Sequence, residues 1–295
     1  MREPPKMDEY DFMVPPPAHR IVGYRIDYPG PTARTIAYTM EHFVAVDRYD
    51  AATSYNQRLD SVYHALDMVA YRHLGVPGAP DAGPWVQGGF DCALHLFLDD
   101  WRTPPDPHAP KAKPYNLVIA ARRRDKEVGW FEHFSRGLIL GLLSGRREDV
   151  RRFCSWPWAE LVPDYSGMGD DLEDEVALMY LVLASGLRDE PMPGIEPVMA
   201  KIRRCRLKRP RLLLKLWEAA QAGEQVAFAE ALIRSLEHFA AVPRLDPADA
   251  RIGDRLALPQ TAISLAAGCR GLRVPALPPE LSAFLITRRS LGLDD

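Results

Sequence analysis

The distribution of proline is the sequence feature that most constrains the fold of this chain. Prolines gather in residues 1–31, in residues 104–116 and again at positions 275–279. Because the proline ring fixes φ and removes an amide hydrogen, these segments exclude the interior of a regular helix. The stretches between them carry apolar residues at three- and four-residue spacing, which indicates amphipathic helices. The sequence therefore predicts an all-α protein, an irregular helical bundle or α-α superhelix built of antiparallel helix hairpins.

The same pattern predicts the domain organisation. A Pro-rich N-terminal arm occupies residues 1–31, a first helical region residues 32–103, a Pro-rich connection residues 104–116, and a second helical region residues 117–295. The chain has 295 residues, of which 47% are hydrophobic. This is enough for a sizeable core, and we expect the two helical regions to pack as one domain.

Periodicity and helix-ending residues give the expected helices. They cover about 32–47, 54–74, Phe90–Trp101, Val128–Ser144, Arg146–Phe153, Asp170–Leu187, Arg211–Ala222, Glu224–Ala240, Leu256–Cys269 and Pro278–Arg289. In the first of them Ile36 and Met40 lie on the predicted apolar face. Residues 75–89 are expected to be loop, and Leu117–Ala121 is too short to assign to strand or helix. The clearest hairpin is the pair that meets at Gly223.

Charge and cysteine content restrict the class of protein. The chain has 37 Lys and Arg against 40 Asp and Glu, a formal charge of −3, so no global field favours nucleic acid or anionic lipid. The four cysteines are scattered, as expected of reduced thiols in a cytoplasmic protein. The acidic, Pro-rich start is unlike a signal peptide, and no apolar run reaches the ~18 residues of a membrane span.

No motif for catalysis, metal binding or cofactor binding is recognisable. Glu-His-Phe occurs at 41–43, 132–134 and 237–239, but adjacent helical residues point about 100° apart, which favours coincidence over a shared site. The patterns HExxH, GxSxG and GxGxxG are all missing. The sequence thus predicts no catalytic residue, no metal and no cofactor.

Two charge clusters remain as candidate surfaces. Asp170, Asp171, Glu173, Asp174 and Glu175 are typical of a helix N-terminus, and they would alternatively form a docking surface for a basic protein partner. The basic run Lys201–Arg211 lacks the interleaved aromatic residues of a nucleic-acid site. A solvated helix end followed by a linker is therefore favoured there.

The C-terminal half resembles the bacterial immunity protein 49 family. The resemblance is carried by Leu213–Phe239, LLKLWEAAQAGEQVAFAEALIRSLEHF, and by Ala262–Leu272, AISLAAGCRGL. Its landmarks are Gly223, Phe228, His238, Arg270-Gly271 and Pro278-Pro279, and it covers about residues 130–285. It implies an all-α protein, encoded beside a polymorphic toxin, that binds this cognate toxin stoichiometrically and protects the producing cell. If that toxin is a cationic nuclease, the five carboxylates at 170–175 would be the docking face.

Two other classes stay open. A solenoid-like helical adaptor would hold several peptide or protein partners in a concave surface, whereas an immunity protein has one dominant partner. An enzyme would need a site assembled from residues distant in sequence, in a deep pocket with convergent histidines or carboxylates.

Overall fold

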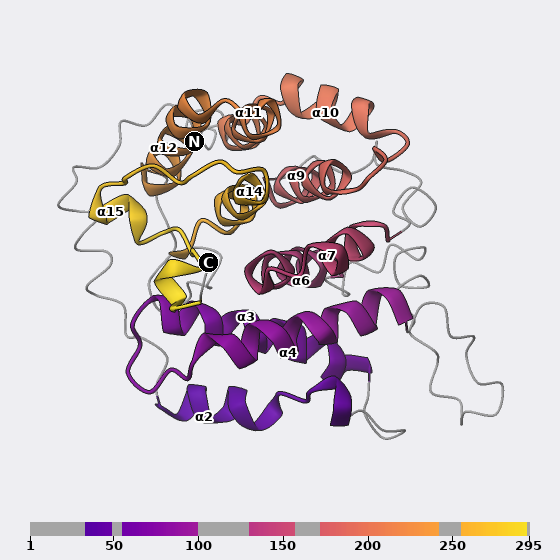
Figure 1. Ribbon diagram of the computed structural model, residues 1–295, viewed down its shortest axis with the longest axis vertical. Helices are drawn as coiled ribbons and strands as arrows, with labels where there is room; N and C mark the ends of the chain where they lie inside the picture. Colours follow the sequence, from indigo (N-terminus) through magenta and orange to yellow (C-terminus); the bar gives the residue numbers. More distant parts are fainter. Residues whose placement is uncertain (1–32, 49–54, 100–129, 157–171, 242–254, 294–295) are drawn as a thin grey trace, which may run out of the picture.

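The computed structural model describes residues 33–48, 55–99, 130–156, 172–241 and 255–293 (Figure 1). In these ranges the chain is all-α and contains no strand, as predicted. The first part contains α2 (Ala33–His42), η2 (Val46–Arg48), α3 (Tyr55–His73), α4 (Ala82–Leu94) and the π-helical turn η3 (His95–Asp99). The second part contains α6 (Trp130–Ser144), α7 (Arg147–Cys154), α9 (Leu172–Leu187), α10 (Ile195–Arg204), α11 (Lys208–Ala222), α12 (Gln225–Ala241), α14 (Leu258–Cys269), α15 (Pro279–Ser282) and η5 (Arg289–Leu291).

Helix α6 lies at the centre of the packing. It contacts α3 and α4 on one side and α9 and α14 on the other (Figure 1). Its residues from Gly137 to Leu143 are buried, and Phe134 stacks on Phe153 of α7 with ring centroids 4.6 Å apart. The helices of both parts therefore share one continuous hydrophobic core.

The predicted loop at residues 75–89 is wrong over its second half, because α4 already begins at Ala82. Pro84 lies in the first helical turn, where its missing amide hydrogen removes no helical bond. Gly89 allows close contact with α3, since a Cβ at this position would lie 2.3 Å from the Cβ of Ala65. Gly89 is therefore a position of close helix packing.

Three further predictions need correction. Met40 is 49% exposed, and Thr39 rather than Met40 shares the buried face of α2 with Ile36. The predicted helix Pro278–Arg289 is only the short α15 followed by irregular chain and η5. Residues 195–204 form α10, a helix that is missing from the predicted set; Pro197 lies in its first turn, where proline is tolerated.

The hairpin of α11 and α12 is confirmed. Gly223 ends α11 with φ of +72°, a left-handed conformation that glycine adopts without strain. Trp217 of α11 and Phe228 of α12 are both fully buried. The predicted arm at 1–31, the connection at 104–116 and the run at 117–121 lie outside the described residues. No helix in the described ranges has the length and apolarity that crossing a membrane requires.

Candidate partner-binding face

The C-terminal ends of α6, α9, α11 and α14 meet on one side of the molecule. Contacts between the turns connect them: Arg288 Nη1 donates to the carbonyl of Leu143, and Arg270 Nη2 donates to the carbonyl of Gly186 at 2.8 Å. Arg151 of α7 lies 3.7 Å from Asp189, which follows α9. We call this surface the helix-end face and define it by the charged residues of the turns at 145–152, 188–190, 222–224, 270–273 and 287–289.

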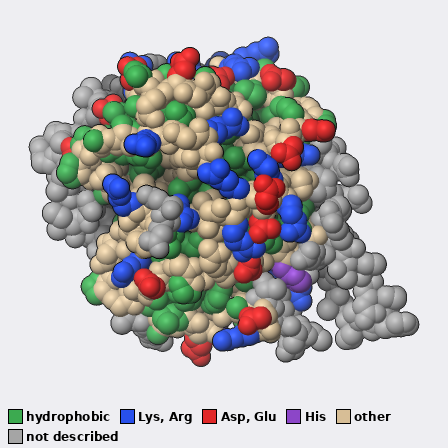
Figure 2. Space-filling model, in the orientation of Figure 1, with side chains coloured by type: hydrophobic (Ala, Val, Ile, Leu, Met, Phe, Trp, Pro, Cys, Tyr) green, Lys and Arg blue, Asp and Glu red, His purple; other side chains and the backbone are tan. Residues whose placement is uncertain are grey.

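Charges of both signs alternate across this face (Figure 2), and arginines outnumber carboxylates. The arrangement has an electrostatic reason. The exposed carbonyl groups at a helix C-terminus carry partial negative charge, which favours cations nearby. The arginines of the turns therefore stabilise the helix ends at which they lie.

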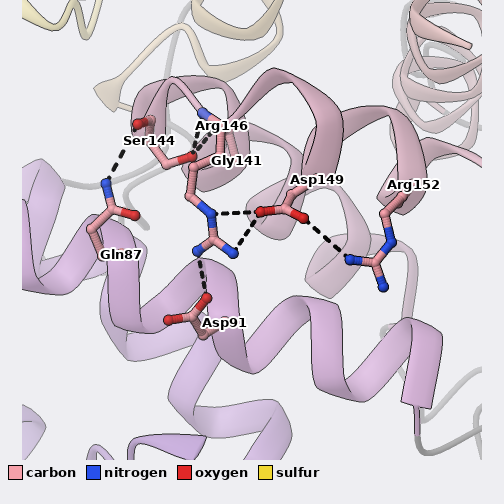
Figure 3. A network of polar contacts seen from close by, with 7 residues as sticks. All are labelled: Gln87, Asp91, Gly141, Ser144, Arg146, Asp149 and Arg152. Carbon is pink, nitrogen blue, oxygen red and sulfur yellow. Dashed lines mark hydrogen bonds and ion pairs between the residues drawn. The ribbon is translucent and has the colours of Figure 1, made fainter.

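A network centred on Arg146 forms one edge of the face (Figure 3). Its guanidinium donates to Asp149 Oδ2 at 2.7 Å and to Asp91 Oδ1, which lies on α4, 55 positions earlier in the chain. Asp149 also accepts a hydrogen bond from Arg152 Nη1 at 3.2 Å. Ser144 ties the turn together, because its hydroxyl donates to the carbonyl of Gly141 and accepts from the amide of Arg146.

This network fixes the guanidinium of Arg146 in one orientation. Partial burial alone would lower the pKa of Arg146, but the hydrogen bonds and charges of Asp91 and Asp149 outweigh it and raise that pKa above its ordinary value. The group therefore stays charged, and the α6–α7 turn is held against α4. A surface with ordered side chains loses less conformational entropy when it binds a partner.

Beside the network lies an open hollow of about 440 Å³. The π-helical turn η3 borders it, a rare form that occurs often at functional sites. Its lining combines carboxylates, cations and apolar groups: Asp47, Asp91, Asp149, His95, Arg146, Arg152, Leu94 and Leu98. The mixture and the openness suit recognition of a partner's side chains better than enclosure of a small substrate.

The residues predicted to bind a partner are not brought into this face by any observed contact. Asp170 and Asp171 lie outside the described residues. Glu173, Asp174 and Glu175 lie at the start of α9, as predicted, but their side chains are also outside what the structure describes. Their role as a docking surface therefore stays a prediction.

The basic run Lys201–Arg211 forms a separate corner between α10 and α11. Arg203 pairs with Glu218 at 2.8 Å, and Arg211 donates to the carbonyls of Arg206 and Leu207. These contacts within the corner agree with the prediction of a solvated helix end. The predicted linker is short, because residues up to Arg204 are helical.

A second polar cluster is buried between α3 and α6. Arg136 is 3% exposed, donates to Asp67 Oδ1 at 2.7 Å and lies 3.5 Å above the ring of Tyr63. Burial raises the pKa of Asp67, and the charge of Arg136 offsets only part of that effect. Burial likewise lowers the pKa of His64. Because Arg136, Asp67 and Tyr63 contact one another between two packed helices, we assign this cluster a structural role.

The described residues offer no cluster of three or more His, Cys, Asp or Glu side chains that would hold a metal ion. Cys154 is fully buried, and burial raises the pKa of its thiol, so it does not form the reactive thiolate at neutral pH. Of the three Glu-His-Phe copies, those at 132–134 and 237–239 lie on α6 and α12, and the copy at 41–43 spans the end of α2.

Sequence reasoning missed the Arg146 network. Its available signal is the sequence Ser144-Gly145-Arg146 between two amphipathic helices, which by itself predicts only a turn. Asp91, which accepts a hydrogen bond from Arg146, lies in a stretch expected to be the start of a short helix.

No family model, no curated protein and no solved structure matches this chain.

Proposed function

We propose that this chain is an immunity protein that binds and blocks a cognate bacterial polymorphic toxin stoichiometrically, and that the helix-end face contacts the toxin. The observation that carries the proposal is the ordered network of Arg146, Asp91 and Asp149 on that face (Figure 3). The toxin as partner comes from the resemblance of residues 130–285 to the immunity protein 49 family. The two arguments are independent, because the resemblance rests on helix-packing residues.

The physical demands of such a function agree with the face. Stoichiometric blocking needs a stable interface of about 800 Å² on each partner, and it needs no turnover. Arginine is enriched at protein interfaces, because its planar guanidinium binds carboxylates with two parallel hydrogen bonds while its stem packs on apolar surface. Ordered arginines on a rigid helical framework provide these contacts without a large loss of conformational entropy.

The test is co-expression with the C-terminal domain of a polymorphic toxin encoded by the neighbouring gene. We expect the wild-type chain to restore growth of the producing cell and to elute with the toxin domain as a one-to-one complex. Arg146→Met should weaken the complex, while Arg203→Met, which removes one arginine from the basic corner, should not. Growth inhibition that persists despite expression of the folded chain would refute the immunity function. Binding of several unrelated proteins would instead indicate an adaptor.

A further inference from the structure

The arginines of the helix-end face fall into two groups. Five of them are engaged in contacts within the chain: Arg146, Arg151, Arg152, Arg270 and Arg288. Arg270 also lies over the ring of Trp217, 5.5 Å from its centroid. This group holds the helix ends together, and part of its hydrogen-bonding capacity is used within the chain.

The guanidinium groups of the other four make no hydrogen bond or ion pair with any residue that the structure describes. They belong to Arg147, Arg188, Arg273 and Arg289, of which Arg188 is half-buried and the other three are exposed. For Arg273, only the main chain is engaged, in two hydrogen bonds with the side chain of Gln225. All four are therefore available to an anionic group from outside.

The contacts of the engaged arginines place the backbone positions of these four in neighbouring turns. Arg147 follows Arg146, and Arg289 follows Arg288, whose guanidinium bonds to the end of α6. Arg188 precedes Asp189, the residue that approaches Arg151. Arg273 lies three positions after Arg270, which bonds to the end of α9. Each position is thus within three residues of a contact between neighbouring turns.

The surrounding charges indicate what kind of anion fits. Glu148 and Glu190 are exposed on the same face and would repel the closely spaced phosphates of a nucleic acid. A protein surface carries carboxylates at wider spacing and adds cations that meet Glu148 and Glu190. Val226, 72% exposed beside Gln225, adds an apolar contact of the kind found at protein interfaces.

From these observations we infer that Arg147, Arg188, Arg273 and Arg289 bind carboxylates on an acidic protein surface, and that the partner is therefore acidic at its contact site. The inference deepens the proposed function, on which the identity of the partner rests. It is the reverse of the prediction from the cluster at 170–175, which would require a basic partner.

The inference is tested with poly-L-glutamate as a model acidic polypeptide and with a DNA duplex of equal charge. The variant Arg147→Gln/Arg188→Gln/Arg273→Gln/Arg289→Gln removes the available arginines. The matched control, Arg203→Gln/Arg204→Gln/Arg206→Gln/Arg211→Gln, removes the same charge from the basic corner. Thermal unfolding establishes that both variants are folded, and a triple variant that retains the half-buried Arg188 replaces the first one if it is not.

We expect the wild-type chain to bind poly-L-glutamate in about 50 mM salt and more weakly in about 300 mM, because such contacts are screened. The face variant should lose at least about tenfold in affinity, and the control variant should lose much less. Equal losses in both variants, or no binding by the wild-type chain, would overturn the inference. Tighter binding of DNA that depends on the same four arginines would also overturn it, in favour of a nucleic-acid surface.

Poly-L-glutamate separates this inference from the proposed function. If the toxin domain does not bind while the polypeptide binds through the four arginines, the immunity function fails and the chemistry of the face stands. If the toxin domain binds equally well to the wild-type chain and the face variant, the inference fails and the immunity function stands.

Discussion

A buried guanidinium is tolerated only where its charge and its donors are satisfied, and Arg136 shows how this chain achieves that. Its donors reach the carboxylates of Asp67 and Glu132 and the carbonyl of Tyr63, while its flat face lies on the Tyr63 ring. Removal of one member of such a buried pair leaves the other charge without compensation. The stability of the contact between α3 and α6 therefore depends strongly on the single residue Arg136.

We expect Arg136→Met to lower the free energy of unfolding by about 3–5 kcal/mol at neutral pH. The loss should depend on pH. A carboxyl group whose folded-state pKa is raised contributes stability below its unfolded-state pKa of about 4, and this contribution is lost as pH rises through the folded-state pKa. Without Arg136 the pKa of Asp67 rises further, so the variant should be least impaired in acid and most impaired above neutrality.

Urea unfolding at about pH 5 and pH 8, followed by circular dichroism, measures this difference. Arg136→Met/Asp67→Leu should recover most of the lost stability, because it removes the uncompensated charge as well. Arg152→Met is the surface control and should change the unfolding free energy by less than about 1 kcal/mol, since its pair with Asp149 is exposed. A loss for Arg136→Met that does not vary with pH would contradict the role given to Asp67.

Two glycines inside helices of this chain, Gly89 and Gly268, have different roles. Gly89 of α4 lies against Ala65 of α3, where an added Cβ would meet Ala65 and Leu140 at 2.3 and 3.0 Å. Gly268 of α14 is exposed, and a Cβ there would meet nothing within 4 Å. The first glycine sets how closely two helices pack, and the second only lowers helix propensity.

The pair gives opposite predictions for the same substitution. Gly89→Ala should destabilise the protein by about 1–3 kcal/mol, because overpacking pushes α3 and α4 apart. Gly268→Ala should stabilise it by about 0.5–1 kcal/mol, because alanine favours helix and reduces the entropy of the unfolded chain. Thermal unfolding of both variants measures the two changes in stability. Equal changes of the same sign would show that the close approach of α3 and α4 at Gly89 is unimportant.

The hydrogen bond that Arg288 makes to the C-terminal end of α6 gives a further prediction. Arg288 donates to the carbonyl of Leu143 at the end of α6, and the guanidinium of Arg289 beside it makes no hydrogen bond or ion pair with a described residue. Arg288→Met should therefore lower stability by about 1 kcal/mol, the usual contribution of one such bond. Arg289→Met is the neighbouring control and should change stability by less than about 0.5 kcal/mol. Chemical denaturation that gives equal losses would argue against capping by Arg288.

Sequence reasoning was reliable where one helix alone determined the pattern. The hairpin around Gly223 and the long α3 follow from apolar spacing and a helix-ending glycine. It failed where a neighbouring helix determined the role of a residue, as at Gly89, whose use depends on Ala65. The Arg146 network is of the second kind, because its carboxylates come from α4 and α7 and only the packed structure brings them together.

At the scale of the whole molecule, the described helices share one core although residues 100–129 separate the two parts in sequence. Leu140 of α6 is fully buried and close to α4, since an added Cβ at Gly89 would meet its Cδ1. Helix α6 also contacts α9 and α14. A disturbance at α6 should therefore be transmitted to both sides of the core.

We expect Leu140→Ala to reduce the stability of the whole described body by about 2–5 kcal/mol, the usual effect of a cavity at a buried leucine. Hydrogen exchange followed by mass spectrometry, under conditions where exchange requires opening, reports this loss element by element. The slowest amides of α3 and those of α12 should lose protection by the same amount. Val226→Ala, at an exposed position, should leave both unchanged. If only α3 and α4 respond to Leu140→Ala, the two parts unfold separately, and the helix-end face joins two cooperative units instead of belonging to one.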